Sequence, residues 1–241
     1  MLSKNQIKLI NSLSQKKYRN KYNLFVAEGI KVIKELLNSN YELELLYSTT
    51  DVFYVPTEKL QLITEADLKK ISKLATPQVA LALFKIPEKN DTMKTVDFAV
   101  ALDGVRDPGN LGTIIRLCDW FGVKQILCSN DTVDCYNEKV VQATMGSLAR
   151  VHIAYADLYE TLKNTDLPLL GTFMDGENVY KTQLPSSGIL ILGNEANGIS
   201  SSIASLASQK ISIPQFGENQ STESLNVATA TAILLSEWRR G

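Results

Sequence analysis

The sequence contains few cysteines and only one histidine. Its three cysteines, Cys118, Cys128 and Cys135, are odd in number and lack a C-x-x-C spacing, which argues against a disulfide framework and against a zinc site. The histidine, His152, lies in an apolar stretch, where such a residue is more often a packed side chain than a ligand. We therefore expect buried thiols and no bound metal.

Long apolar runs are also missing. No stretch approaches the roughly 18 apolar residues of a membrane span, and residues 1–23 lack the continuous apolar core of a secretion signal. With 44% hydrophobic and 21% charged residues among 241, the composition has no signature of disorder. These features predict a soluble globular protein that contacts no membrane, with the cytoplasm as its default location.

The chain has no overall excess of positive charge, since its net charge is −1, which argues against a generally basic nucleic-acid binder. The total hides an asymmetry, because residues 1–40 carry a net charge of +6 and the remaining residues carry −7. Tyr18 and Tyr22 alternate with basic residues, which suits a phosphate-facing surface beside stacking aromatic rings. The candidate nucleic-acid contacts are Lys16, Lys17, Arg19 and Lys21. A solvated helix face would explain the same charge pattern.

Helical and strand periods alternate in two blocks, and the first predicts a small α/β unit. Its expected strands cover 24–29, 43–49, 52–56 and 79–86. Its expected helices cover 5–13, 29–38 and 64–74, the last opened by Thr64 and Asp67 in a capping-box spacing. Residues 87–95 are polar and begin with proline, so we expect a linker there. The boundary near residue 92 divides the chain into domains 1–92 and 93–241.

The second block repeats apolar strands and helices, including a helix over 137–149, and predicts a mostly parallel sheet covered on both faces. Ligands of such sheets bind at the carboxyl ends of the strands. The functional residues should therefore follow the expected strands 98–103, 188–193 and 211–214.

The segment 103–116 after the first of these strands reads DGVRDPGNLGTIIR. It lacks the spacing of a dinucleotide fingerprint and the Gly-Lys-Ser/Thr of a phosphate loop, so both nucleotide-binding interpretations fail. The glycine-rich turn places Asn110 at the start of a helix and Arg116 six residues on, where the two side chains face different directions. A helix cap and a surface cation are the simpler alternatives for these two residues.

The other two strands are followed by polar loops. Gly193 allows a ligand to approach the backbone, and Glu195 is held on the short loop behind it. After the third strand, the loop 214–223 leads to Ser224-Leu225-Asn226, which we expect to open a long apolar helix with Ser224 as its N-cap. Three such loops at neighbouring strand ends predict a binding cleft, although turn residues alone would explain each loop separately.

Three segments together resemble the motifs of the SpoU/TrmH branch of the SPOUT RNA methyltransferases. They read DGVRDPGNLGTIIR, ILGNEANGIS, and IP followed by SLNVATATAILLSE, and the resemblance covers residues 97–240. The first block resembles the ribosomal-protein-like RNA-binding domain of ribosomal RNA members of that family, through KKYRNKYNLFVAEG and the helix beside it.

The resemblance implies an enzyme that transfers methyl from S-adenosylmethionine to a ribose 2′-hydroxyl of RNA, with ribosomal RNA as the favoured substrate. It also implies a homodimer and a C-terminal trefoil knot that forms the cofactor pocket. Two alternatives stay open: the same chemistry on transfer RNA, and a non-catalytic RNA-binding or ribosome-assembly factor.

Carried over onto this sequence, the family's polar active-site set falls on Asn110, Arg116, Glu195, Ser224 and Asn226. Its cofactor-binding residues fall on Gly193, Ile213 and Leu225. Arg116 is the family's activator of the hydroxyl, but a guanidinium is a poor base, so we favour a clamp on an RNA phosphate. Whether it acts in its own subunit or across the dimer is open. The loop Gln215 to Glu223 is longer than the family's common spacing and adds Glu218 and Glu223, which leaves the identity of the substrate open.

Overall fold

The computed structural model describes residues 1–88, 97–216 and 224–240. The chain divides into two compact units, Met1–Glu88 with Asp134–Ala149 and Lys89–Val133 with Arg150–Gly241. A single cut near residue 92 does not produce this division, because residues 134–149 belong to the first unit. The boundary itself and most of the expected linker lie at 89–96, outside the described residues.

The first unit is built on a four-stranded sheet with the order β1-β4-β2-β3. Its strands are β1 (Leu24–Glu28), β2 (Leu43–Ser48), β3 (Leu60–Leu62) and β4 (Ala80–Lys85). β4 runs antiparallel to β1 and β2, and β3 runs parallel to β2. Its helices are α1 (Lys4–Ser12), α2 (Lys16–Tyr22), α3 (Ile30–Leu37), α4 (Glu65–Ile71) and α6 (Glu138–Ala143), with short 3₁₀ turns η1 (Thr57–Lys59) and η2 (Ser147–Ala149).

Local sequence explains where α4 begins. The hydroxyl of Thr64 accepts a hydrogen bond from the backbone N–H of Asp67, so the predicted cap of α4 is confirmed.

The expected strand 52–56 is wrong, because this segment has no regular structure. Phe53 is buried between the exposed Val52 and Tyr54, as in a strand, but the segment joins none of the four strands of the first unit's sheet and Pro56 closes it.

The segment 134–149 packs on β1 inside the first unit. The ring of Tyr136 lies 4.9 Å from that of Phe25, and its hydroxyl is 3.4 Å from the hydroxyl of Tyr41. Beside this aromatic cluster, Nη2 of Arg19 lies 2.5 Å from Oδ2 of Asp134. The expected helix 137–149 is therefore present in part, as α6 and η2, and it completes the core of the first unit.

The second unit contains a six-stranded sheet with the order β10-β8-β9-β5-β6-β7. Its strands are β5 (Phe98–Leu102), β6 (Gln125–Cys128), β7 (His152–Tyr155), β8 (Leu169–Asn178), β9 (Gly188–Leu192) and β10 (Gln209–Ser212). Every pair of neighbours in this sheet is parallel, which confirms the predicted parallel sheet.

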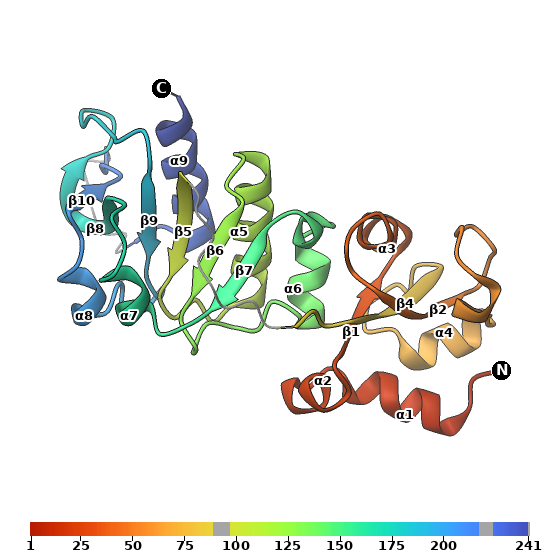
Figure 1. The fold of residues 1–241 in the computed structure, drawn as a ribbon. Helices are drawn as coiled ribbons and strands as arrows, with labels where there is room; N and C mark the ends of the chain where they lie inside the picture. The colour runs from red at the N-terminus through yellow and green to blue at the C-terminus, as the bar shows by residue number, and fades with distance from the viewer. Residues whose placement is uncertain (89–96, 217–223, 241) are drawn as a thin grey trace. The chain divides into compact units, whose positions relative to one another are not determined.

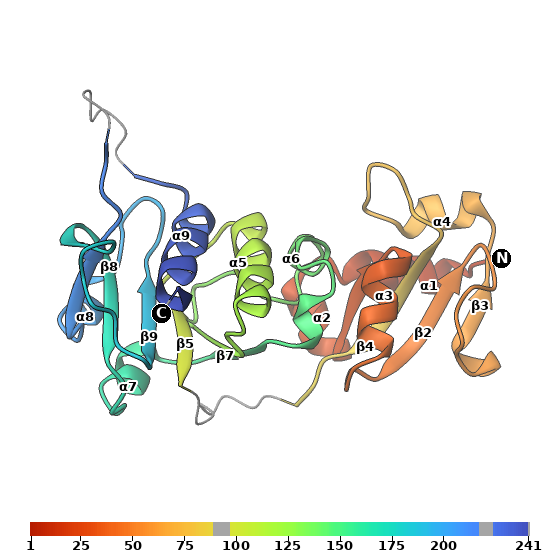
Figure 2. The same cartoon turned by 90° about the horizontal axis from the view of Figure 1, so that it is seen from above.

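Helices cover both faces of this sheet (Figure 1). They are α5 (Pro108–Trp120), α7 (Leu158–Leu162), α8 (Ser201–Ala204) and α9 (Val227–Arg239). α7 and α8 bury Leu158, Leu162 and Ile203 against the strands. α5 and α9 pack side by side on the other face (Figure 2). This arrangement leaves the carboxyl ends of the strands open between the two helical layers.

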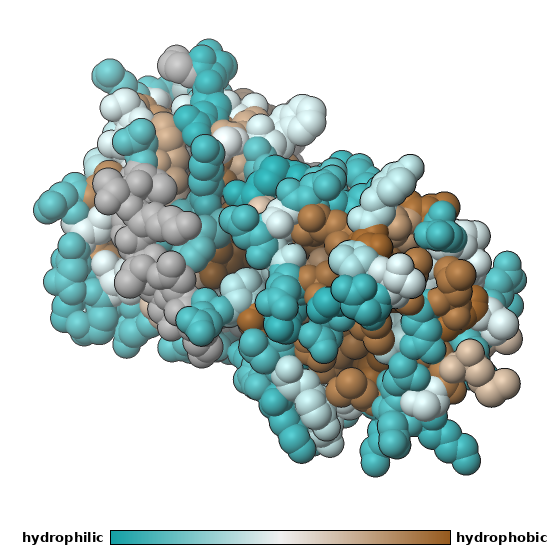
Figure 3. Space-filling model, turned by 45° about the vertical axis from the view of Figure 1, so that its right-hand side comes forward, coloured by the Kyte–Doolittle hydropathy of each residue, from teal (hydrophilic) through white to brown (hydrophobic). Residues whose placement is uncertain are grey.

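The surface carries both polar and apolar side chains. On the face drawn in Figure 3, apolar side chains (brown) gather between long hydrophilic ones (teal). The three cysteines are buried thiols, as expected. Among the described residues, no helix is long and apolar enough to cross a membrane, and no group of three His, Cys, Asp or Glu side chains is placed to hold a metal ion.

Candidate active site

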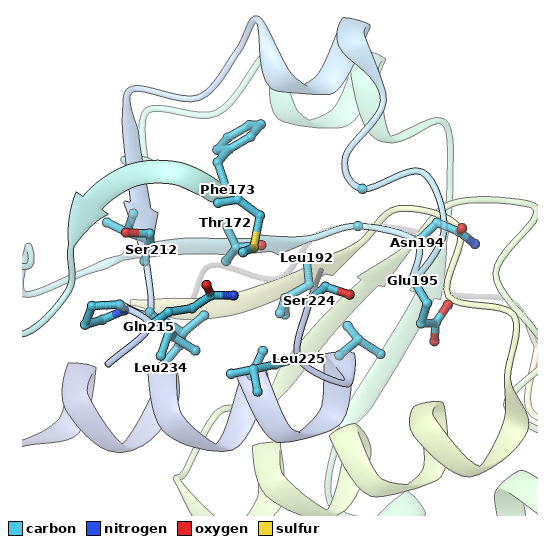
Figure 4. A pocket seen from close by; sticks show the side chains of 18 of the residues that line it. Thr172, Phe173, Leu192, Asn194, Glu195, Ser212, Gln215, Ser224, Leu225 and Leu234 are labelled. Atoms are coloured by element: carbon cyan, nitrogen blue, oxygen red, sulfur yellow. The ribbon is translucent and has the colours of Figure 1, made fainter. Parts of the chain in front are cut away.

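A cavity of about 580 Å³ lies in the second unit at the carboxyl ends of β9 and β10 (Figure 4). The three residues that the sequence assigns to a cofactor, Gly193, Ile213 and Leu225, all line it. Glu195 and Ser224 line it as well. The volume lies in the usual range of small-molecule sites, so this cavity is a candidate binding site at the strand ends where the sequence predicts one.

Gly193 lies where no side chain fits. A Cβ atom added there would lie 2.1 Å from the carbonyl carbon of Gly198 and 2.2 Å from the nitrogen of Ile199. The backbone segments on the two sides of the turn 194–198 are therefore in contact with each other. Residues of this turn line the cavity. Glycine is thus required here by the close approach of the backbone of Gly198 and Ile199, and Gly193 presents main-chain groups to the cavity that it lines.

The opposite wall comes from a bulge in β8 that the sequence pattern did not predict. Lys210 of β10 pairs with Gly171, but the next residue, Ile211, pairs with Glu177. The residues between bulge out of the sheet, and Thr172, Phe173 and Met174 line the cavity. The signal was the glycine at each end of this segment, since glycine inside a strand often marks a bulge; Gly176 lies so close to Ile211 that an added Cβ would be 2.5 Å from its carbonyl carbon.

Asn110 connects the three motif segments. Its Nδ2 donates a hydrogen bond to Oε1 of Glu195 at 2.8 Å, and its Oδ1 accepts one from Nδ2 of Asn226 at 2.9 Å. The backbone N–H of Asn110 donates to Asp107, the N-cap of α5, at 2.8 Å. Both ends of the Asn110 amide are thus in use, and only its nitrogen can donate to the Glu195 carboxylate, which defines its orientation.

The start of α9 differs from the sequence prediction. The helix begins at Val227, and its N-cap is Asn226, whose Oδ1 accepts hydrogen bonds from the backbone N–H groups of Ala228 and Thr229. The expected cap, Ser224, instead lies two residues earlier, exposed and facing the cavity. An asparagine caps as well as a serine does, and here its other atom reaches Asn110 at the same time.

The turn that carries Glu195 is held by its neighbour Asn194, a residue that the motif comparison did not single out. Oδ1 of Asn194 accepts from the backbone N–H of Ala196 at 2.9 Å and of Asn197 at 3.2 Å. Its Nδ2 donates to the carbonyl oxygen of Gly104 at 2.7 Å. Asn194 therefore joins the turn after β9 to the loop after β5, and it places Glu195 beside Asn110.

Arg116 lies apart from the other candidate residues. Its side chain is exposed on α5 and makes no hydrogen bond or ion pair within the described ranges. The structure thus brings Asn110, Glu195 and Asn226 into direct contact, places Ser224 on the same cavity, and leaves Arg116 open to solvent. Glu218 and Glu223 of the long loop lie outside the described residues.

The basic segment of the first unit forms α2, and it needs one correction. Lys16, Lys17 and Lys21 are exposed, but Arg19 is only 2% exposed. The Arg19 guanidinium donates to Asp134 and to the carbonyl oxygens of Leu13 and Ser14. Arg19 is therefore a buried structural residue and is not available to a phosphate.

These features define an α/β protein with a small-molecule site at the ends of parallel strands and a hydrogen-bonded chain of amides and a carboxylate at its mouth. The family model of the SpoU rRNA methylases matches residues 97–236, and that of the MRM3-like substrate-binding domain matches residues 4–82.

The 23S rRNA (guanosine(2553)-2′-O)-methyltransferase RlmP of Bacillus subtilis is 30% identical over 98% of this chain and 97% of its own. A TrmH-family structure from Porphyromonas gingivalis is 40% identical with a TM-score of 0.91, covering 100% and 99% of the two chains. An AdoMet-bound rRNA methyltransferase from Sinorhizobium meliloti is 30% identical with a TM-score of 0.87, covering 100% and 97%. The chain belongs to the SpoU rRNA methylase family and is an S-adenosylmethionine-dependent RNA methyltransferase.

Proposed function

We propose that the protein methylates a ribose 2′-hydroxyl of ribosomal RNA in the cytoplasm. The observation that carries this proposal is the hydrogen-bonded chain Asn226–Asn110–Glu195 at the mouth of the cavity lined by Gly193. The B. subtilis relative, alike over nearly its whole length, is named for this reaction on 23S rRNA. The relatives from Bacillus subtilis and Neisseria meningitidis, both bacterial 23S rRNA methyltransferases, support the cytoplasmic location.

The cavity fits S-adenosylmethionine by its size and by the chemistry of its walls. Gly193 offers backbone groups without a side chain in the way, and Ile213 and Leu225 offer apolar surface. These three residues hold the adenosine moiety in our proposal. The cofactor, when bound, supplies an electrophilic methyl group on a sulfonium.

The polar chain orients the acceptor ribose. Glu195 is exposed at the cavity, with Oε1 held by Asn110, so its carboxylate can accept a hydrogen bond from a ribose hydroxyl. Ser224, on the same wall, presents a hydroxyl to the same space. A ribose hydroxyl is a very weak acid and a poor nucleophile. In our proposal, these side chains contribute mainly by aligning its oxygen with the methyl group.

Arg116 clamps a phosphate of the RNA beside the reacting hydroxyl in this proposal, and the proton leaves through that phosphate or through water. Its guanidinium stays protonated in proteins and is a poor base, whereas it binds phosphate through two donors. Its exposed position on α5, outside the polar chain, supports a contact with something other than its own cavity.

We also propose the family's homodimer and C-terminal knot. The indole of Trp120 at the end of α5 is 83% exposed, and α5 carries Arg116 on its open surface, so a second copy packed there would cover apolar surface next to the proposed clamp. The match of residues 97–236 to the SpoU rRNA methylase family supports the knot.

The first unit contacts the RNA in our proposal, and the functional division follows the boundary near residue 92. The match of residues 4–82 to a substrate-binding domain supports this role. Lys16, Lys17 and Lys21 lie exposed on α2, and the rings of Tyr18 and Tyr22 are stacked with their centroids 6.4 Å apart. Stacked rings beside ammonium groups suit a single-stranded or looped RNA.

Incubation of the protein with labelled S-adenosylmethionine and unmodified transcripts of ribosomal and transfer RNA tests the proposal. We expect label in ribosomal RNA, at one nucleotide whose 3′ bond then resists alkaline cleavage. Label on a base would contradict ribose methylation, and label in transfer RNA alone would contradict the ribosomal substrate.

Replacement of Arg116 tests the clamp. We expect Arg116→Ala to lower methyl transfer by on the order of 10²-fold, because the hydroxyl loses its alignment, while S-adenosylhomocysteine still binds. Near-normal methyl transfer in this variant would exclude an Arg-centred mechanism.

A further inference from the structure

The loops around the site contain little positive charge for an enzyme that binds RNA. In the segments 103–116, 193–200 and 213–226, the only basic residues are Arg106 and Arg116. The same segments contain several carboxylates, and residues 41–241 carry a net charge of −7. A polyanion is bound mainly by cations that displace its counterions, so these two arginines are the local groups able to do so.

Arg106 is exposed but held in one orientation. Its side chain is 69% exposed, and Nη2 donates to Oδ2 of Asp131 at 3.0 Å. This hydrogen bond uses a single nitrogen of the guanidinium, so further N–H donors of the exposed side chain remain for a ligand. A guanidinium already oriented loses less side-chain entropy when it binds a phosphate than a free one does.

The partner of Arg106 is itself held by a buried network. The hydroxyl of Ser129 donates to Oδ1 of Asp131 at 2.6 Å and accepts from the backbone N–H of Gly104 at 2.9 Å. The Ser129 hydroxyl, and after it Arg106, lower the pKa of the Asp131 carboxyl below its usual value. Asp131 is therefore ionised near neutral pH, and it holds the Arg106 guanidinium at a defined place on the loop after β5.

This place lies next to the turn that carries Glu195. The carbonyl oxygen of Gly104 accepts from Nδ2 of Asn194 at 2.7 Å, while its N–H donates to Ser129. A Cβ added at Gly104 would lie 3.1 Å from Oδ2 of Asp131 and 3.7 Å from Cβ of Asn194. Gly104 is thus packed between the anchor of Arg106 and the residue that positions Glu195.

We propose that Arg106, oriented by Asp131, is a binding residue for a phosphate of the substrate RNA next to the nucleotide that is methylated. The inference rests on the proposed function, since it assigns a contact to that same substrate. Arg106 would add a positive charge at the strand ends, separate from that of Arg116, which lies more than two helical turns along α5.

Salt-dependent RNA binding by the full chain tests this contact, with a transcribed 23S rRNA fragment as the probe. For Arg106→Ala we expect the Kd for RNA to rise about 3- to 10-fold at 0.1 M salt, and the slope of log K against log salt to fall by about 1. S-adenosylhomocysteine binding should stay within about twofold of the unmodified protein, because the substitution removes an RNA contact and leaves the lining of the cavity intact. Arg106→Lys should keep the salt slope, because it keeps the positive charge. It should lose part of the affinity for RNA, because lysine lacks the two parallel N–H donors of the guanidinium.

A matched control comes from Arg150, the other exposed arginine of this unit that pairs with an aspartate. Nη2 of Arg150 lies 2.8 Å from Oδ2 of Asp119, and its side chain is 47% exposed. Arg150 precedes β7, at the amino ends of the strands and away from the cavity. Arg150→Ala should leave both the Kd and the salt slope unchanged.

The outcomes separate the two proposals. If the unmodified protein methylates the RNA and Arg106→Ala keeps its Kd and salt slope, the phosphate contact is wrong and the proposed function stands. If Arg106→Ala and Arg150→Ala lose the same RNA affinity, the effect comes from the net charge of the protein, and the proposed phosphate contact of Arg106 is wrong. Failure of the unmodified protein to methylate any RNA would overturn the proposed function itself.

Discussion

The amide of Asn110 is the residue on which the arrangement of the site depends. It donates to Glu195 and accepts from Asn226, and so joins side chains that are 85 and 116 positions away in the sequence. A side chain with a donor and an acceptor on the same planar group is required, which aspartate and leucine of similar size do not provide. The sequence placed Asn110 at the helix start, but its two partners were visible only in the structure.

Replacement of Asn110 tests this connection. We expect Asn110→Ala to lower methyl transfer by on the order of 10²-fold, since Glu195 loses its orientation. Asn110→Asp should be no better, because it places a second carboxylate against Glu195. Thr113→Ala, an exposed change on the same helix, is the control for single-turnover kinetics. Normal kinetics in Asn110→Ala would exclude a role for the bridge.

Asn226 has two roles, which one pair of variants separates. Asn226→Ala removes the cap of α9 and the bond to Asn110, so we expect a loss of about 1 kcal/mol in the free energy of unfolding together with a loss of methyl transfer. Asn226→Ser restores a cap but not the bond, so it should recover stability without recovering activity. Denaturant unfolding measures the stability of the two variants, and a methyl-transfer assay measures their activity. Full activity in Asn226→Ser would show that activity requires the helix cap and not the bond to Asn110.

At the scale of elements, the cavity is made by the places where regular strands stop being regular. The turn 194–198 after β9 and the bulge in β8 form facing walls, and each depends on a glycine at a close backbone contact. Their apolar runs identified both strands, because such a run is a local signal in the sequence. The runs did not identify the bulge, because a register shift depends on the neighbouring strand, here β10.

Substitution of two glycines near this turn, Gly193 and Gly198, should affect cofactor binding differently. Gly198 has φ +68° and open space around it, so Gly198→Ala should cost about 1 kcal/mol through backbone strain and keep most of the cofactor affinity. Gly193→Ala forces Cβ into the backbone of Gly198, so we expect S-adenosylhomocysteine to bind more than about tenfold more weakly, which corresponds to 1.4 kcal/mol. Calorimetric titration measures both; equal affinities would argue against a cradle at Gly193.

At the scale of the whole molecule, the first unit is not a continuous stretch of the sequence. It includes residues 134–149, which follow the first part of the second unit in the chain. Residues 134–149 leave the second unit after Val133 and complete the core of the first unit, where Asp134 pairs with the buried Arg19. The basic residues of α2 therefore divide into exposed lysines and one structural arginine. A charge pattern in the sequence could not separate them, because the partner lies 115 positions away.

This division predicts different effects for two neighbouring cations. Arg19→Ala leaves Asp134 without its buried partner, and we expect the first unit to lose about 3 kcal/mol of stability. Lys17→Ala should change stability by less than about 0.5 kcal/mol and weaken RNA binding instead. Both tryptophans, Trp120 and Trp238, belong to the second unit, so hydrogen exchange resolved over β1 and α6 is the appropriate measurement. Unchanged exchange in Arg19→Ala would contradict a structural role.

The resemblance to the SpoU/TrmH family assigned Gly193, Ile213 and Leu225 to the cofactor. The sequence by itself determined the parallel sheet and the strand ends at which we expect the site. These follow from residue periods and turn residues, which act over a few positions. The tertiary structure decided that Asn226 and not Ser224 caps α9, that Arg19 is buried, that β8 bulges and that residues 134–149 join the first unit. Each of these depends on a partner distant in the sequence, and the free energy of such a contact exists only once the chain has brought the two groups together.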